Sequence, residues 1–186
     1  MDDDLERQFE ESVKRLNKLS ATSAVTLELL DTLSDDDIAY AVFSSLENGR
    51  LAKNITSTVE YSEQLPPGPR MVYTAQLVDI DVPNGGFVQL FWNQDSRIVE
   101  LAIGAFELMG APKTAQLVSR ALARFREEQE LHARQRATGS LQGFSDTYSL
   151  SKLGEFDVEY WEHVDHHRDL IVRYIRAHPE EFVTET

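Results

Sequence analysis

The chain has 186 residues, 41% of them hydrophobic, and no cysteine. This length lets one domain bury a sizeable core, and the lack of thiols excludes disulfides, thiolate zinc sites and cysteine nucleophiles. The formal net charge of −14, from 32 acids and 18 bases, argues against nucleic acid and anionic lipid as ligands and favours basic partners.

The negative charge is concentrated near the two ends of the sequence. Residues 1–49 carry 12 acids and 4 bases, residues 140–186 carry 10 and 4, and residues 113–139 carry 3 and 6. The N-terminus opens with aspartates rather than with a basic and apolar leader, and no apolar run reaches the roughly 18 residues of a membrane span. We therefore expect a cytoplasmic protein.

Apolar periodicity predicts helices in the N-terminal third. The first helix is expected over residues 4–19, where apolar side chains recur at spacings of four, four, three and three: Leu5, Phe9, Val13, Leu16 and Leu19. Residues 21–33 suggest a short helix or an irregular segment. Ser34 then begins a clear helix, with Asp37 in the place of a capping-box acid, and Asn48-Gly49 ends it. We expect residues 1–33 to form an extension packed on the core, and residues 34–186 to form the main domain.

The middle of the chain leads into a glycine turn. Residues 56–61 carry threonine, valine and tyrosine, which favour a short strand or an extended loop. A proline-rich connector follows, and residues 70–82 then have helical spacing.

Helices are expected again after the turn. One runs from a Ser96 cap to Gly110, and the next begins at Pro112 and carries outward-facing arginines. The glycines and serines of residues 137–158 indicate a loop. A final helix is expected from about residue 157 or 164 to 177, with Trp161 among its buried side chains.

The least generic segment is the turn itself, residues 84–93. Asn-Gly and a second glycine favour a tight turn, and three aromatics and three side-chain amides accompany them. The positions singled out are Asn84, Gly85, Gly86, Phe87, Gln89, Phe91, Trp92 and Asn93. In a structural interpretation, the aromatics anchor the turn and the amides satisfy backbone groups at the broken helix ends. In a functional one, Asn84, Gln89, Trp92 and Asn93 line a polar pocket with an aromatic wall.

This string resembles the DNA-mimic-protein-nineteen-like family of bacteria. Two further matches support the resemblance, Gly104-x5-Gly110-Ala111 and the stretch from Tyr174 to Glu180. It covers roughly residues 34–183, with residues 82–111 as the specific core. One departure is Pro83, which stands where the family tends to have a polar residue. The resemblance implies an all-helical domain, mostly of unestablished activity, whose named example acts as a DNA mimic that sequesters a DNA-binding regulator.

Other chemistry is weakly indicated. His163, His166 and His167 have the spacing of one helix face near several acids, but no His-Glu-x-x-His pattern is present, and a solvated face explains them better than a metal site. Neither a Gly-x-Ser-x-Gly elbow nor a phosphate loop occurs. Glutamates at 127, 128 and 130 interrupt the arginines of residues 120–136, which fits partners for the acidic ends better than a nucleic-acid groove. We predict no metal and no cofactor.

The acidic residues lead to a more specific hypothesis than the other motifs do. Carboxylates three or four residues apart on a helix form lines of negative charge, and such lines can imitate the phosphates of DNA. The predicted partner-binding acids are Asp2, Asp3, Asp4, Glu6, Glu10, Asp35, Asp36 and Asp37 on one flank, and Glu155, Asp157, Glu159, Glu162, Asp165 and Asp169 on the other.

These patterns together predict an all-α fold, a single-domain bundle of about six to eight helices with the Asn-Gly-Gly-Phe turn between core helices. The predicted function is non-enzymatic: an acidic domain that binds a basic protein, such as a DNA-binding regulator, by mimicking DNA. Two alternatives stay open. One is a ligand-binding or hydrolytic domain with its site at the glycine turn, and the other is a structural homodimer in which the arginine-bearing helix meets an acidic end of its twin.

Overall fold

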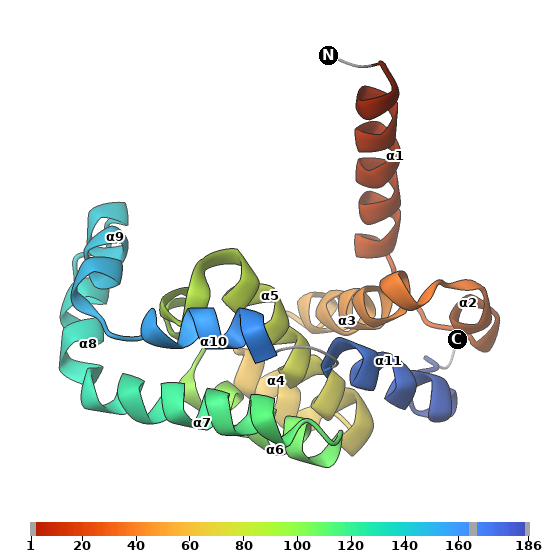
Figure 1. Ribbon diagram of the computed structural model, residues 1–186. Coiled ribbons are helices and arrows are strands. Elements are labelled where there is room, and N and C mark those ends of the chain that lie inside the picture. Colours follow the sequence, from red (N-terminus) through yellow and green to blue (C-terminus); the bar gives the residue numbers. More distant parts are fainter. Residues whose placement is uncertain (1–2, 164–166, 185–186) are drawn as a thin grey trace. The chain divides into compact units, whose positions relative to one another are not determined.

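The computed structural model describes residues 3–163 and 167–184 (Figure 1). Over these residues the chain forms eleven α-helices, one short 3-10 helix and no strand. The predicted all-helical fold is confirmed, whereas the predicted count of about six to eight helices is not. None of these described helices combines the length and the apolar character that crossing a membrane requires.

The chain divides into two compact units, which we call terminal and central. The terminal unit joins residues 1–56 to residues 172–186, and the central unit comprises residues 57–171. This division falls at a different point from the domain boundary that the sequence predicts after residue 33, and that boundary stays a prediction.

The terminal unit is held together by contacts between the two ends of the chain. Its elements are α1 (Asp3–Ser20), α2 (Leu27–Thr32), α3 (Asp35–Ala52), the second half of α11 (His167–Ala177) and the 3-10 helix η1 (Pro179–Glu181). Thr184 N donates to Val25 O, and Val25 N donates to Thr184 Oγ1, both at 3.0 Å. The Arg176 guanidinium also donates to the carbonyls of Leu30 and Leu33 at the end of α2. The two Arg176 bonds satisfy carbonyls that the short α2 leaves unpaired at its C-terminal end.

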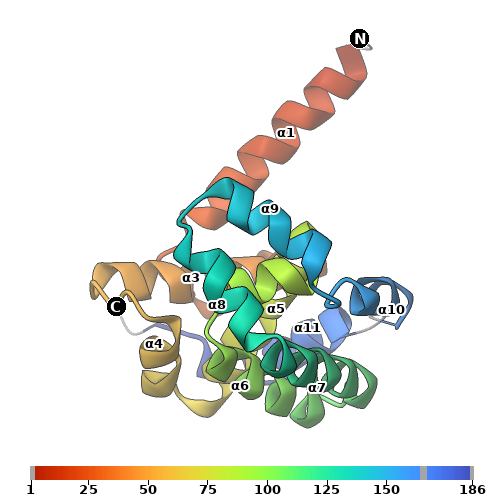
Figure 2. The same ribbon diagram turned by 90° about the vertical axis from the view of Figure 1, so that its left-hand side faces the viewer.

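The central unit is built around one long buried helix. Its elements are α4 (Thr58–Gln64), α5 (Pro67–Asn93), α6 (Ser96–Leu108), α7 (Pro112–Glu127), α8 (Gln129–Ala137), α9 (Leu141–Leu150), α10 (Glu155–His163) and the start of α11. α6 packs against both α5 and α7, while α4 and α10 also contact α5 (Figure 2). Val72, Tyr73 and Val78 of α5 are fully buried. A helix covered on several sides has no single apolar stripe, so buried residues occur on every face of α5.

Residues 56–61 do not form the predicted strand or extended loop. Most of them lie in α4, where the Ser57 hydroxyl accepts a hydrogen bond from Glu60 N at 3.2 Å and caps the helix. Val59 and Tyr61 are buried in it. Helix capping and burial outweigh the β-propensity of these residue types, which depends strongly on context.

The predicted loop over residues 137–158 is wrong for most of its length, because α9 occupies its centre. Ser140 caps α9 by accepting from Gly143 N at 3.1 Å. Gly143 serves close packing, since a Cβ at this position would lie 2.6 Å from the carbonyl oxygen of Gln135. Figure 2 shows α8 and α9 beside each other. The glycine and serines that indicated a loop are thus a contact residue and caps.

Three further expectations need correction. The last predicted helix is two helices, α10 and α11, and residues 164–166 between them lie outside the described residues. Trp161 of α10 is 61% exposed rather than buried. The cap of α6 is Asp95 and not Ser96, because the Asp95 carboxylate accepts from Arg97 N at 2.9 Å.

Candidate functional site

The glycine motif forms a bend inside α5. Gly85 and Gly86 have non-helical backbone angles, and Gly86 lies at φ 68° and ψ −174°. This region is open almost only to glycine. Gly86 also has no room for a side chain, since a Cβ would lie 2.3 Å from Asp157 Oδ2. Two independent constraints therefore require glycine here.

The bend is braced by side chains from α9 and α10. The Asp157 carboxylate accepts a hydrogen bond from Phe87 N at 2.9 Å, and the Tyr148 hydroxyl donates to Gly85 O. Both backbone groups have left the helix hydrogen-bond ladder, so they need outside partners. Burial raises the pKa of the Asp157 carboxyl, and the hydrogen bond from Phe87 N opposes that rise. Asp157, predicted as a partner-binding acid, is thus half-buried against the bend.

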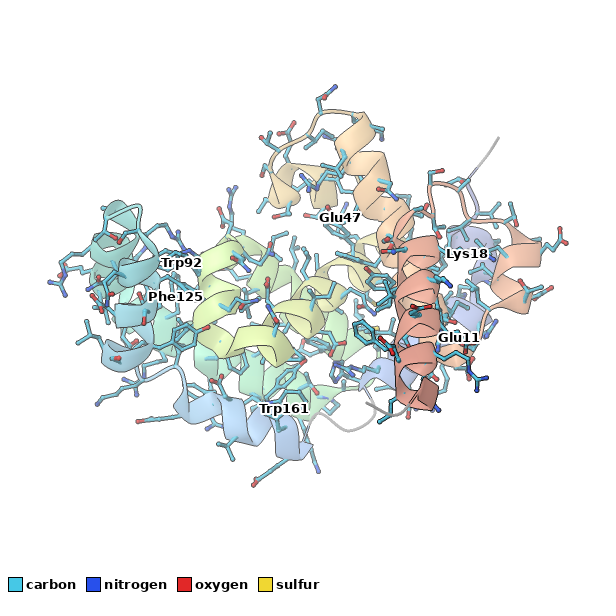
Figure 3. All side chains as sticks on the ribbon, turned by 90° about the horizontal axis from the view of Figure 1, so that it is seen from above. Glu11, Lys18, Glu47, Trp92, Phe125 and Trp161 are labelled. Carbon is cyan, nitrogen blue, oxygen red and sulfur yellow. The ribbon has the colours of Figure 1, made fainter. Side chains whose placement is uncertain are left out.

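The motif aromatics fill the space on either side of the bend. Phe87 and Phe91 are fully buried. The Phe91 ring stacks on Phe125 of α7 with centroids 4.2 Å apart, and Phe87 meets Tyr160 of α10 edge to face at 5.8 Å. Trp92 is only half-buried (Figure 3). The two phenylalanines therefore lie in the core of the central unit.

Two motif amides, Gln89 and Asn93, together with the neighbouring Gln94, hold a buried carboxylate, Asp81, which is 5% exposed. Its oxygens accept from Gln89 Nε2 at 3.3 Å, Asn93 Nδ2 at 2.6 Å and Gln94 Nε2 at 2.9 Å. We call this arrangement the amide clamp. Among the described residues, no cationic side chain forms an ion pair with Asp81. The sequence interpretation expected these amides to satisfy backbone groups, but the amide nitrogens of Gln89 and Asn93 bind the Asp81 side chain instead. Asn84, the third amide of the motif, is exposed.

An open groove of about 620 Å³ lies beside the clamp. It is lined by Gln89, Trp92, Asn93, Arg136, Gly139, Ser140, Leu141 and Phe144. The Arg136 guanidinium lies 5.7 Å from the centre of the Trp92 ring and donates to the carbonyls of Phe91 and Trp92 at the end of α5. An aromatic wall beside amide oxygens and a hydroxyl is suited to a small polar ligand.

A second buried carboxylate, Asp79, lies two residues before the first, on the opposite side of α5. Asp79 accepts from Tyr160 OH at 3.1 Å and from Arg168 Nε at 2.8 Å, and lies 2.7 Å from His167 Nε2. His167, considered above for a metal site, is fully buried in this cluster. Burial, followed by the Asp79 charge, raises the pKa of Tyr160. The other two histidines of that hypothesis are not tested, because His166 and the His163 side chain lie outside the described residues.

The first predicted acidic flank lies in the terminal unit. Glu6 and Asp36 are exposed and form no ion pair with any described residue, and Glu10 has only the long contact to Lys14 at 3.8 Å. Asp35 is bound by Arg176 at 2.9 Å, and Asp37 by Arg15 at 2.6 Å. Asp2 and the side chains of Asp3 and Asp4 lie outside the described part.

The second predicted flank lies in the central unit. Glu155, Glu162 and Asp169 are exposed. Glu159 is bound by Arg120 at 2.7 Å, and Asp165 lies outside the described residues. Because the two flanks belong to different units, each is a surface of its own unit.

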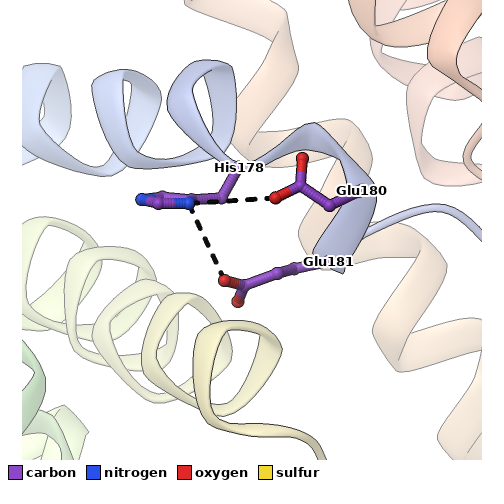
Figure 4. A group of neighbouring side chains, drawn as sticks. All are labelled: His178, Glu180 and Glu181. Atoms are coloured by element: carbon purple, nitrogen blue, oxygen red, sulfur yellow. Dashed lines mark ion pairs between the residues drawn. The ribbon is translucent and has the colours of Figure 1, made fainter.

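His178, between α11 and η1, lies near two acids of η1 (Figure 4). Among residues 3–163 and 167–184, His178, Glu180 and Glu181 are the one group of three such side chains close enough to share a metal ion. His178 Nδ1 lies 3.9 Å from each carboxylate, and Glu181 already accepts from the Tyr174 hydroxyl at 3.1 Å. Exposed acids of this kind are common on a chain this negative, so this group does not by itself indicate a metal site.

Sequence reasoning missed the two buried acids and their partners. Asp79 and Asp81 interrupt the apolar run from residue 71 to 82, and an acid inside such a run is a signal for a buried polar cluster. The roles of Tyr148 and Arg136 had no such signal, since both act on backbone groups more than 40 residues away.

Comparisons with known proteins give one match. A family model described as DMP19-like protein matches residues 63–178. Searches of the curated proteins and of the solved structures found no match. The matched range includes the bend, the amide clamp and the Asp79 cluster, and it excludes α1, α2 and α3.

Replacing Gly86 with alanine should destabilise the protein by at least about 2 kcal/mol, because the backbone would be strained and the Cβ would displace Asp157. Gly104→Ala in α6 is the matched control. A Cβ there meets nothing within 4 Å, so alanine should leave stability unchanged or raise it by about 0.5–1 kcal/mol. Urea unfolding measures both, and equal stability of the two variants would contradict the assigned role of Gly86.

Asp157 should make the protein less stable as pH rises. A carboxyl whose pKa is raised by folding binds its proton more tightly in the folded state, so its contribution is favourable at low pH. That contribution is lost as the pH rises from 3.8, the ordinary pKa of the carboxyl, through the raised pKa of the folded state. Asp157→Asn keeps an acceptor for Phe87 N and should remove this part of the pH dependence of the melting temperature. An unchanged slope between the two proteins would refute the assignment.

Asp81→Asn should destabilise the protein by about 1–3 kcal/mol, because it turns one carboxylate oxygen into a donor that faces amide donors. Adding Asn93→Asp restores an acceptor opposite that donor, so the double variant should regain part of the loss. Chemical denaturation of the wild type, both single variants and the double variant measures the coupling. Strictly additive effects would contradict direct contact between the two side chains.

Proposed function

The chain belongs to the DMP19-like protein family, and on that premise we propose that it is an acidic protein-interaction domain that binds a basic protein. The narrower proposal is that it mimics DNA and occupies the nucleic-acid groove of a DNA-binding regulator. The family name and the charge of the chain support this function. The negative charge of the chain by itself accounts for an attraction to basic proteins.

The observation that carries the proposal is the charge of each unit. The terminal unit has 15 acids and 8 bases, and the central unit has 17 acids and 10 bases, so each has a net charge of −7. A basic partner would therefore be attracted to either unit alone. Attraction of this kind accelerates association and weakens as salt screens it.

The face of α10 has further features of a binding surface. Trp161 is 61% exposed and Val158 is 64% exposed, and Glu155 and Glu162 lie on the same short helix (Figure 3). Tryptophan is enriched among the residues that dominate binding energy, and its ring attracts arginine and lysine. An exposed tryptophan flanked by carboxylates that form no ion pair with a described residue suits a partner rich in arginine.

The predicted acids contribute unequally to this proposal. Asp35, Asp37 and Glu159 are neutralised by arginines of their own unit, and Asp157 is engaged at the bend. The strongest candidates are therefore the exposed acids without an ion pair among the described residues. They include Asp36, Glu155 and Glu162.

The two alternatives have less support. The groove beside Trp92 favours a small ligand, but the amide nitrogens of Gln89 and Asn93 are already engaged by Asp81. The dimer through the arginine-bearing helix loses its main argument, because Arg120, Arg124 and Arg126 form ion pairs within the chain. Neither alternative is needed to account for the charge.

Reversal of the three unpaired acids should weaken binding of a basic partner. The variant Asp36→Lys/Glu155→Lys/Glu162→Lys should bind at least about tenfold more weakly at low salt, since like charges then face the partner. The partner is first captured from cell extract at low salt, eluted by a salt step and identified by mass. Binding is then measured for the purified pair over a salt series, with duplex DNA as competitor.

The matched control reverses three other exposed acids, Glu60, Glu107 and Glu130, with the same change in net charge. It should retain most of the affinity. Equal losses of affinity in both variants would mean that only the total charge matters. An affinity that does not change with salt concentration would rule out the electrostatic proposal. Failure of DNA to compete would remove the mimicry and leave the protein-interaction role.

A further inference from the structure

The helix α1 leaves a continuous apolar stripe uncovered. Leu5 is 61% exposed, Phe9 70%, Val13 39% and Leu16 53%. They follow the four, four, three spacing of one helix face. Within the terminal unit, α1 extends away from α2 and α3 (Figures 1 and 2). A row of large exposed apolar side chains on an extended helix indicates a binding surface.

The attachment of α1 explains why the stripe ends where it does. The helix is anchored near its C-terminal end, where Leu19 is buried, Arg15 binds Asp37, and Asn48 Nδ2 donates to Ser20 O at 3.0 Å. The residues from 5 to 18 are all exposed. A helix with so few tertiary contacts gains much of its stability from whatever covers its apolar face.

The charge along α1 is segregated and identifies the occupant. Residues 2–11 carry six acids and one base, for a net charge of −5, while residues 12–20 carry three bases and no acid, for +3. Two copies in antiparallel orientation place each acidic half beside a basic half. Parallel copies would bring like charges together. Glu11 and Lys18, one in each half, are labelled on the surface of α1 in Figure 3.

We propose that α1 pairs with α1 of a second copy of this chain, antiparallel, through the stripe formed by Leu5, Phe9, Val13 and Leu16. A two-fold axis at the centre of the stripe sets Leu5 opposite Leu16 of the other copy and Phe9 opposite the small Ser12. Such a contact is isologous, since the same surface serves both partners. This surface lies outside the residues that match the family, and it is independent of the proposed basic partner.

A lipid surface fits α1 less well. Helices that lie on membranes usually carry lysine and arginine on the polar face, where they meet anionic headgroups. The exposed N-terminal half of α1 is strongly acidic, so an anionic bilayer would repel it. The second copy is the occupant that matches both the apolar stripe and the charge pattern.

Sedimentation equilibrium of the full chain tests the pairing. The wild type should show a concentration-dependent monomer–dimer equilibrium that weakens with salt. Phe9→Ser/Leu16→Ser should raise the dissociation constant at least about 100-fold, because each substitution removes apolar contacts in both copies. Asn17→Ser, an exposed polar position of α1 off the stripe, should leave it unchanged.

The orientation is tested by disulfide trapping, since the chain has no cysteine of its own. A mixture of Leu5→Cys and Leu16→Cys chains should cross-link under mild oxidation, whereas Leu5→Cys chains alone should not. Cross-linking of Leu5→Cys to itself would show parallel pairing and overturn the proposal.

Two further results would also overturn it. In the first, the wild type stays monomeric at all concentrations and the Phe9→Ser/Leu16→Ser variant loses thermal stability. That result would mean that the stripe packs against its own chain. The other is binding of the monomer to phosphatidylcholine or phosphatidylserine vesicles without self-association. Circular dichroism of each variant confirms that it is folded, and the disulfide test does not depend on the serine variants.

Discussion

The bend in α5 is the constraint on which the central unit depends. Gly86 adopts a backbone conformation that only glycine tolerates, and the Asp157 carboxylate lies where a side chain would be. The bend removes backbone groups from the helix ladder, and α9 and α10 supply their partners through Tyr148 and Asp157. The position of α10, with its exposed Trp161, therefore follows from the requirement to pair those groups.

The buried acids of α5 solve the same problem of desolvation in two ways. Asp79 is surrounded by a histidine, a tyrosine and an arginine, whereas the partners of Asp81 in the described part of the chain are neutral amides. Residues two apart on a helix point roughly 200° away from each other, so the two carboxylates organise opposite sides of α5. A buried carboxylate is tolerated only when its oxygens are bonded. Two amides of the family motif, Gln89 and Asn93, are thus explained as partners of an acid that precedes them in the sequence.

Total charge and effective surface charge differ in this protein. Arginines from elsewhere in the same unit neutralise Asp35, Asp37 and Glu159, although all three belong to acidic runs in the sequence. Exposed ion pairs add little stability, but they remove those acids from what a basic partner would meet. The surface available for recognition is therefore narrower than the net charge of −14 suggests.

The sequence by itself determined the helical class, the glycine bend and the burial of Phe87 and Phe91, because apolar spacing and glycine chemistry are local properties. It also contained the α1 stripe and its segregated charge. Only the tertiary structure decided which acids are neutralised, what the motif amides bind and that residues 141–150 form a helix. The pairs responsible, such as Phe87 with Asp157 and Asp79 with His167, are 70 and 88 residues apart. No local pattern encodes such contacts, since they arise from how the helices pack.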